Sequence, residues 1–137
     1  MKKIVNFKLI FIIILLSMFN FKSVFANYDK VFFDFKLKSI SGDEIDLSEY
    51  KGKTVLLVNV ASRCGFTKQY DDLQKIWDTY KNKGFVVIGI PSNQFGSQEP
   101  GTNEEIKEFC EVNFNITFPM TAKADVKGDN AHEIYKW

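Results

Sequence analysis

Two nearly continuous apolar segments separated by one amphipathic segment constrain the fold of this chain more than any other feature. Residues 53–61 and 85–90 contain too few polar side chains for strands that keep one face in water. Between them, apolar side chains recur at helical spacing: Tyr70, Leu73, Ile76, Trp77 and Tyr80. Strand, helix and strand in this order predict a right-handed βαβ unit whose parallel strands are covered on both faces.

Shorter patterns flank this unit. Residues 33–38 alternate between apolar and polar side chains, and residues 44–47 follow the turn-forming residues 41–43, so we expect an N-terminal pair of short strands. Residues 102–105 (Thr-Asn-Glu-Glu) form a capping box, which predicts the start of a helix. The inner stripe of that helix includes three residues: Ile106, Phe109 and Cys110.

The first 26 residues predict export. Lys2 and Lys3 precede the apolar residues 9–16, and residues 24–26 (Val-Phe-Ala) resemble a cleavage site, which is the pattern of a secretory signal peptide. We therefore expect a signal peptide over residues 1–26, one domain over residues 27–137, and a periplasmic or secreted location. An uncleaved N-terminal membrane anchor is the alternative. Removal of four lysines with the signal would change the net charge from +1 to −3, which argues against a nucleic-acid-binding surface.

Cys64 is the strongest candidate for a catalytic side chain. It follows the first apolar strand in the polar context Ser62-Arg63-Cys64-Gly65, where a helix is about to begin. A thiol at such a corner reaches solvent and faces the positive end of the helix dipole, and both conditions favour the reactive thiolate. The alternative is a buried structural cysteine, which the polar context disfavours.

Gln98 lies in the loop after the second apolar strand, within residues 93–101 (Asn-Gln-Phe-Gly-Ser-Gln-Glu-Pro-Gly). The carboxyl ends of neighbouring parallel strands converge at one edge of a sheet, so we expect this loop to lie beside Cys64. An amide there can donate a hydrogen bond to a thiolate and orient a peroxide. Taken alone, a loop glutamine is more often an ordinary surface residue.

Cys110 has two open interpretations. Its position on the apolar helix stripe favours a structural role, whereas a resolving thiol would attack a sulfenic acid on Cys64. In an exported chain the two cysteines could also form a permanent disulfide. His132 is the only histidine, and we interpret it as a surface or capping residue. The sequence has no metal-ligand cluster, phosphate-binding loop or dinucleotide fingerprint, so we expect no cofactor.

Three segments together resemble the glutathione peroxidase family: residues 59–67 (Asn-Val-Ala-Ser-Arg-Cys-Gly-Phe-Thr), residues 91–101 and residues 103–110. The resemblance runs from about residue 33 to residue 137. It implies a thioredoxin-like α/β fold, with a central mixed sheet flanked by helices and an N-terminal β-hairpin. It also implies reduction of hydrogen peroxide or organic hydroperoxides and a role in the response to oxidative stress.

The same resemblance assigns roles to three residues. Cys64 matches the peroxidatic position, Gln98 rather than Gln94 matches the catalytic glutamine, and Cys110 matches the resolving cysteine of the thioredoxin-dependent branch. Members of that branch draw electrons from a thioredoxin-like protein rather than from glutathione. No insertion like the oligomer-forming loop of tetrameric relatives precedes Pro100, so we expect a monomer.

The resemblance also predicts what the sequence does not contain. In the family a Trp-Asn pair lies beyond the point where this sequence ends, and Trp137 matches a position upstream of that pair. The last strands and helix of the fold are likewise expected to be missing. The alternative function is therefore a truncated, non-catalytic thioredoxin-fold remnant or binding module. A disulfide oxidoreductase or copper chaperone is a weaker interpretation, because Cys64-Gly-Phe-Thr67 has no second cysteine.

Overall fold

The computed structural model describes residues 30–137, so the predicted signal peptide over residues 1–26 lies outside the described residues. The helices and strands follow in the order η1 (Phe32–Asp34), β1 (Lys36–Lys38), β2 (Glu44–Asp46), η2 (Leu47–Tyr50), β3 (Thr54–Val60), η3 (Thr67–Gln69), α2 (Tyr70–Tyr80), η4 (Lys81–Lys83), β4 (Phe85–Pro91), α3 (Asn103–Phe114) and α4 (Glu133–Lys136), where η denotes a 3-10 helix. None of the helices in this described part is both long and apolar enough to cross a bilayer.

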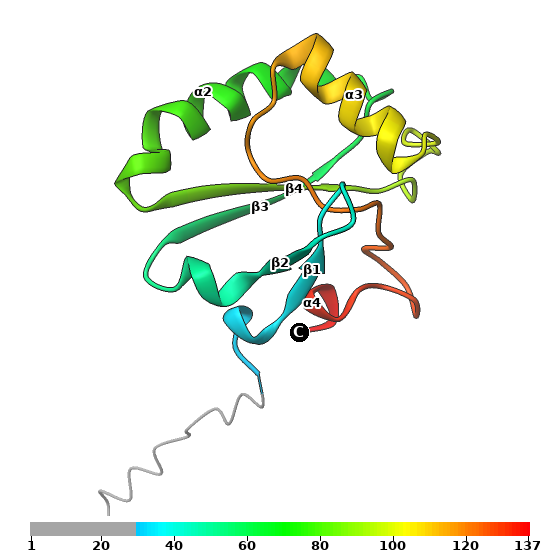
Figure 1. Ribbon diagram of the computed structural model, residues 1–137. Helices are drawn as coiled ribbons and strands as arrows, with labels where there is room; N and C mark the ends of the chain where they lie inside the picture. The colour runs from blue at the N-terminus through cyan, green and yellow to red at the C-terminus, as the bar shows by residue number, and fades with distance from the viewer. Residues whose placement is uncertain (1–29) are drawn as a thin grey trace, which may run out of the picture.

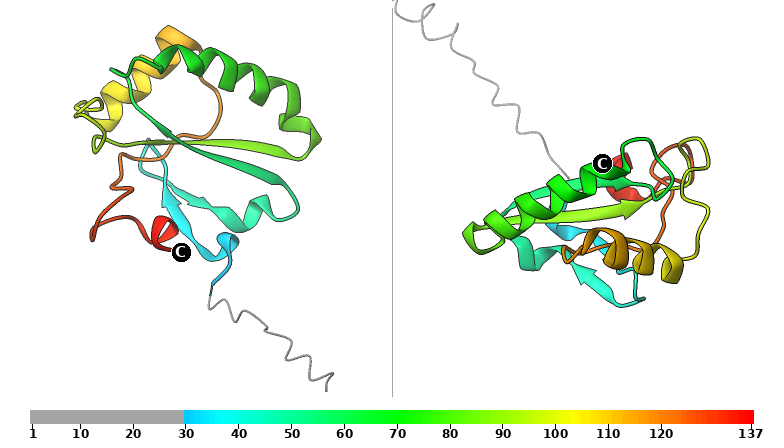
Figure 2. Two further views of the ribbon diagram at one scale, coloured as in Figure 1. Left: turned by 180° about the vertical axis from the view of Figure 1, so that it is seen from behind. Right: turned by 90° about the horizontal axis from the view of Figure 1, so that it is seen from above.

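The predicted βαβ unit is present. β3 and β4 pair in parallel from Thr54↔Phe85 to Val60↔Pro91, and α2 connects them. Figure 1 shows α2 and α3 above these strands, with the antiparallel β1–β2 hairpin and α4 below them. Viewed from above in Figure 2, α2 and α3 lie side by side over the strands. The result is a layered α/β arrangement in which the loops after β3 (residues 61–66) and after β4 (residues 92–102) emerge from the carboxyl ends of the two parallel strands.

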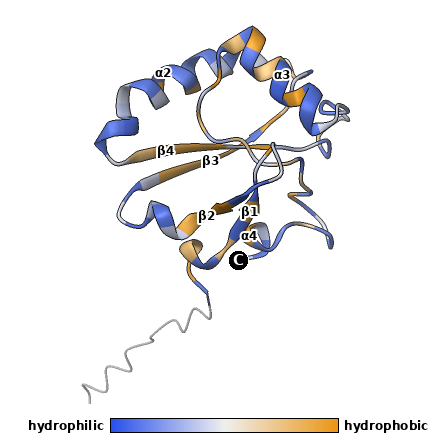
Figure 3. Cartoon of the chain, in the orientation of Figure 1, coloured by the Kyte–Doolittle hydropathy of each residue, from blue (hydrophilic) through white to orange (hydrophobic). Residues whose placement is uncertain are grey.

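Side chains on opposite faces of β3 and β4 pack into two hydrophobic cores, one on each face of the strands. The helix-side core contains Val60 and Val87, packed with side chains of α2 and α3. The hairpin-side core contains Val86 and Ile88, packed with side chains of β1 and α4. Figure 3 shows hydrophobic colours along most of β4 and through the middle of β3. Successive strand residues point to opposite faces, which is why both faces of these strands need a cover.

Cover on both faces is complete for β4 and partial for β3. Residues 86–91 of β4 are buried, whereas residues 55–58 of β3 are only half-buried. β4 lies between β3 and a parallel bridge from Gly89 to Met120, while the other edge of β3 pairs with no strand within residues 30–137. The apolar composition therefore predicted the presence of β3 correctly, but it overestimated how deeply this strand is buried.

The N-terminal strand is shorter than its alternating pattern predicts. Residues 32–34 form the 3-10 turn η1, and β1 begins only at Lys36. The Asp34 carboxylate accepts a hydrogen bond from the Val31 N–H (2.9 Å), and the Asp34 N–H donates to the Val31 carbonyl (2.9 Å). These local bonds compete with strand pairing, so the turn replaces the first two predicted strand residues.

The helix starts and stops follow the expected chemistry. Thr102 Oγ1 accepts from the Glu105 N–H (3.3 Å), and the Glu105 carboxylate accepts from the Thr102 N–H (2.8 Å), so the predicted capping box of α3 is confirmed. After α2 and the 3-10 turn η4, Gly84 adopts a φ of +78°, a left-handed conformation that ends the helical segment. The capping box thus fixes where α3 begins, and Gly84 fixes where the helical segment that follows α2 ends.

Candidate active site

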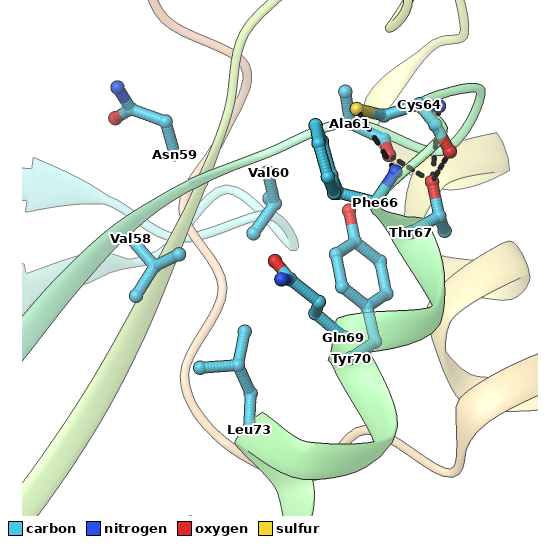
Figure 4. Close-up of a pocket in the computed structure, with 10 residues that line it drawn as sticks. All are labelled: Val58, Asn59, Val60, Ala61, Cys64, Phe66, Thr67, Gln69, Tyr70 and Leu73. Carbon is cyan, nitrogen blue, oxygen red and sulfur yellow. Dashed lines mark hydrogen bonds between the residues drawn. The ribbon is translucent and has the colours of Figure 1, made fainter.

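Cys64 lies in the loop between the end of β3 and η3, where its side chain is half-buried. The buried Thr67 hydroxyl holds this loop. It accepts from the Cys64 N–H (3.1 Å) and lies 2.7 Å from the Cys64 carbonyl oxygen and 2.9 Å from that of Ala61 (Figure 4). The loop backbone is therefore fixed from inside, while the Cys64 side chain keeps access to solvent.

One backbone donor reaches the sulfur atom. The Phe66 N–H donates to Cys64 Sγ at 3.5 Å, and the 3-10 turn that leads into α2 begins one residue later. The Phe66 ring beside it is 72% exposed. The sequence placed Cys64 at a strand-to-helix corner with an open approach, and the structure has the cysteine in that position.

Gln98 lies in the loop between β4 and α3, and the structure ties this loop to the Cys64 loop. The Arg63 N–H donates to the Gln98 carbonyl oxygen (3.0 Å). Within residues 30–137 the half-buried Gln98 amide has no hydrogen-bond partner, so its donors remain available to a bound molecule. The expected convergence of the two loops is thus present.

Gln94, the other amide of this segment, has a structural role. Its oxygen accepts from the N–H groups of Val126 (2.7 Å) and Lys127 (3.0 Å), and its NH₂ group donates to the Lys127 carbonyl (3.1 Å). Gln94 therefore fastens the turn at residues 125–128 to the end of β4. Its side chain is fully engaged, unlike that of Gln98.

Glu99 is a residue of the site that sequence reasoning missed. Its side chain is only 1% exposed, and one carboxylate oxygen accepts from both the N–H (2.8 Å) and the hydroxyl (3.1 Å) of Ser62. The Glu99 N–H donates to Asn93 Oδ1 (2.9 Å). Glutamate is rarely buried, and nothing in the local pattern indicated that this loop acid turns inward. Glu99 forms the second link between the two loops.

Cys110 lies on the inner face of α3 and is 1% exposed. Burial raises the pKa of its thiol to about 12, and the negative charges of Glu99 and Glu111 act in the same direction. Both cysteines are free thiols in this structure. The structure places Cys110 in the helix-side core, as its periodicity predicted, so contact with Cys64 requires movement of α3 or of the Cys64 loop.

Tyr70, the first residue of α2, closes the site from below. It is 4% exposed, and within residues 30–137 its buried hydroxyl makes no hydrogen bond of normal geometry. Burial raises the pKa of this phenol strongly, and the charged forms of Cys110, Glu99 and Cys64 add to the effect, while the nearby Ala61 N–H, which does not reach hydrogen-bond geometry, opposes it. The sequence indicated Tyr70 only as a member of the apolar helix stripe, so its polar end was missed.

A cavity of about 70 Å³ lies beside Cys64. Figure 4 shows the side chains that line it: Val58, Asn59, Val60, Ala61, Cys64, Phe66, Thr67, Gln69, Tyr70 and Leu73. Its volume exceeds that of one water molecule, and Tyr70 presents its hydroxyl toward the loop above.

Within residues 30–137 no three His, Cys, Asp or Glu side chains gather in a way that could hold a metal ion.

The last residues serve to anchor the chain end. His132 Nδ1 accepts from the Ile134 N–H (3.3 Å), so its predicted capping role is confirmed at the start of α4. Trp137 Nε1 donates to the Lys30 carbonyl (2.9 Å), and its ring packs against Phe35 at 5.9 Å between centroids. Trp137 therefore fastens α4 to the start of the described chain, away from the Cys64 loop.

Residues 32–137 match the family model for glutathione peroxidase. The chain belongs to the glutathione peroxidase family. "Glutathione peroxidase-like peroxiredoxin 2" of Saccharomyces cerevisiae is 49% identical over 106 residues, a match that covers 77% of this chain and 65% of the yeast protein. "Glutathione peroxidase 1" of Helianthus annuus is 51% identical over 109 residues and is matched over 65% of its length.

A glutathione peroxidase structure shares the fold as well as the sequence. The crystal structure of T. cruzi GPX1 is 36% identical with a TM-score of 0.61, and the match covers 78% of this chain and 63% of that one. The chain thus spans just under two thirds of the length of the relatives that it matches. The thioredoxin-like fold expected from the resemblance is confirmed.

Proposed function

We propose that this glutathione peroxidase family chain carries the peroxide-reducing half of a thiol peroxidase, with Cys64 as the nucleophile. The observation that carries the proposal is the double link between the loop after β3 and the loop after β4. The Arg63 N–H donates to the Gln98 carbonyl oxygen, and the Ser62 N–H donates to the Glu99 carboxylate. These links hold the loop of the half-exposed Cys64 thiol against the loop that carries Gln98, whose amide has no hydrogen-bond partner within residues 30–137. The yeast and plant relatives are named as peroxidases or peroxiredoxins, which supports the same chemistry.

The first step is a two-electron oxidation of sulfur. The Cys64 thiolate attacks the nearer oxygen of a hydroperoxide, so a sulfur–oxygen bond forms and the oxygen–oxygen bond breaks. The departing oxygen leaves as hydroxide or alkoxide and takes up a proton to become water or an alcohol. Gln98 is suited to donate a hydrogen bond to the oxygen on which charge develops.

The second step uses Cys110. Its sulfur attacks the Cys64 sulfenic acid, so a disulfide forms and the sulfenic oxygen leaves as water with the thiol proton. Because Cys110 is buried and its pKa is raised to about 12, this step needs local loosening of α3. A thioredoxin-like protein or glutathione then reduces the disulfide by thiol exchange. Substrates are hydrogen peroxide and organic hydroperoxides, and a cyanobacterial relative is named as a hydroperoxy fatty acid reductase.

The test compares three proteins in peroxide consumption with a thioredoxin-type reductant. The wild type should turn over repeatedly, Cys64→Ser should consume no peroxide, and Cys110→Ser should consume about one equivalent and stop at the sulfenic acid. Trapping with a sulfenic-acid reagent, followed by peptide mass spectrometry, locates the oxidised sulfur. Peroxide consumption that persists in Cys64→Ser removes this residue from the mechanism. Absence of any oxidation in folded wild type favours the non-catalytic alternative.

We also propose that the protein is exported and acts as a monomer. The basic, apolar and small-residue pattern over residues 1–26 supports export. N-terminal sequencing of the protein from its native cells should begin at Asn27, and an intact Met1 in the membrane fraction would indicate an anchor instead. Size-exclusion chromatography with light scattering tests the monomer.

A further inference from the structure

The Tyr70 hydroxyl is a polar group in an otherwise apolar helix stripe. Within residues 30–137 no protein group makes a hydrogen bond of normal geometry to it, although phenylalanine would fill the same volume without a polar atom. The ring already packs well, with an edge-on contact to Phe114 at 5.2 Å between centroids. A buried polar group that is left unpaired destabilises a fold, so its presence points to a use in another state of the protein.

The position of the hydroxyl indicates that use. Tyr70 lines the cavity beside Cys64 and also belongs to the helix-side core that contains Cys110. Figure 4 shows its hydroxyl directed at the loop that carries Cys64. Among the groups whose charge raises the Tyr70 pKa after burial are both cysteines. Its ring packs against Phe114, one turn along α3 from Cys110, so Tyr70 borders both the Cys64 cavity and the part of α3 that carries Cys110.

We propose that the Tyr70 hydroxyl relays a proton during disulfide formation, from the Cys110 thiol to the oxygen that leaves the Cys64 sulfenic acid. This inference rests on the proposed function and deepens its second step. Tyr70 gives its own proton to the departing oxygen and takes the proton of Cys110. One sulfur–sulfur bond forms, one sulfur–oxygen bond breaks, water leaves, and the phenol is regenerated.

Burial of Cys110 slows disulfide formation, and a proton relay through Tyr70 removes this obstacle. A buried thiol with a raised pKa is protonated at neutral pH, and a thiol attacks far more slowly than a thiolate. Once α3 loosens and the two sulfurs approach each other, a neutral phenol at this position can remove the thiol proton only as it delivers its own. Because burial keeps Tyr70 protonated, it is available as a donor throughout the neutral range.

The experiment is a single-turnover reaction of the full chain with hydrogen peroxide, followed in two phases. The first phase is sulfenic acid formation, and the second is disulfide formation, measured by loss of titratable thiols. Tyr70→Phe should leave the first phase within about twofold of wild type and slow the second by roughly 100-fold or more, because a positioned acid–base group contributes roughly 10²–10⁴-fold. The solvent deuterium isotope effect on the second phase should also fall.

Tyr80→Phe is the matched control. It removes a hydroxyl from the same helix, but Tyr80 is 47% exposed and lies at the far end of α2. Both phases should be unchanged in this variant. A thermal melt checks folding, and Tyr70→Phe should be at least as stable as wild type because it removes an unpaired polar group.

The outcomes separate this inference from the function on which it rests. A wild-type second phase that Tyr70→Phe does not slow refutes the relay and leaves the peroxidase intact; the hydroxyl is then only a cavity group that water satisfies. A wild type that stops at the sulfenic acid refutes resolution by Cys110, and the relay with it. A wild type whose Cys64 does not oxidise refutes both proposals.

Discussion

Removal of the Glu99 carboxylate tests how the loops after β3 and β4 are held together. In Glu99→Ala, the Ser62 N–H and hydroxyl lose their acceptor, which the structure places at 2.8 and 3.1 Å. Hydrogen bonds to charged groups contribute about 1.5–3 kcal/mol each. Part of this loss is offset, because the substitution also removes a buried carboxylate that no cationic side chain of residues 30–137 approaches within 4.0 Å. We expect a net destabilisation of about 2–4 kcal/mol.

Two milder substitutions separate the contributions of the two Glu99–Ser62 hydrogen bonds to the free energy of unfolding. Glu99→Gln keeps an oxygen that can accept from the Ser62 N–H, and Ser62→Ala removes only the hydroxyl bond of 3.1 Å. Each should cost about 1 kcal/mol, which is typical of one hydrogen bond. Glu108 is exposed and serves as the control, since Glu108→Ala should stay within about 0.5 kcal/mol of wild type.

The assay is urea unfolding followed by tryptophan fluorescence, with the free energy of unfolding extrapolated to water. A Glu99→Ala variant within about 0.5 kcal/mol of wild type would refute the assigned link between the loops. Equal losses for Glu99→Gln and Glu99→Ala would show that the negative charge, rather than the hydrogen bond to the Ser62 N–H, supplies the stability.

Three further predictions concern the framework of the site. Gly89→Ala places a Cβ in a steric clash with Met120 Sδ, so it should destabilise by about 1–3 kcal/mol in urea unfolding, and less when measured in a Met120→Ala background. Gln94→Ala removes three hydrogen bonds to the turn at residues 125–128 and should raise amide hydrogen exchange there while α3 stays protected. Burial raises the pKa of Cys110 to about 12 and that of Tyr70 even further, so above about pH 9 the unfolded chain binds fewer protons than the native one. Stability should therefore fall as pH rises through 9 to 11, and melting temperatures across this range check it; an unchanged value would contradict the burial of these two groups.

Most of the architecture was readable from the sequence because it depends on short-range patterns. The apolar runs at residues 53–61 and 85–90 predicted β3 and β4 and their parallel pairing, which the structure confirms. The capping box at residues 102–105 predicted the start of α3. Each of these signals uses side-chain periodicity or a local hydrogen bond, which a single segment contains in full.

Sequence reasoning failed where a competing local bond or a distant partner decided the outcome. η1 replaced the first strand residues because the Asp34 side chain bonds to the backbone three residues earlier. The half-buried state of β3 depends on which neighbours lie along its free edge. Periodicity predicts which way a side chain points, but it does not report what lies opposite that side chain.

The sequence by itself determined the layered α/β framework, the corner position of Cys64 and the inward-facing stripe that holds Cys110. Only the tertiary structure decided that Glu99 turns inward to bond Ser62 across 37 positions of chain, and that the Tyr70 hydroxyl is buried without a hydrogen bond to any group of residues 30–137. The physical reason is that burial and hydrogen-bond satisfaction depend on groups from other elements. A glutamate in a loop and a tyrosine in a helix stripe therefore show these properties only after β3, β4, α2 and α3 have packed together.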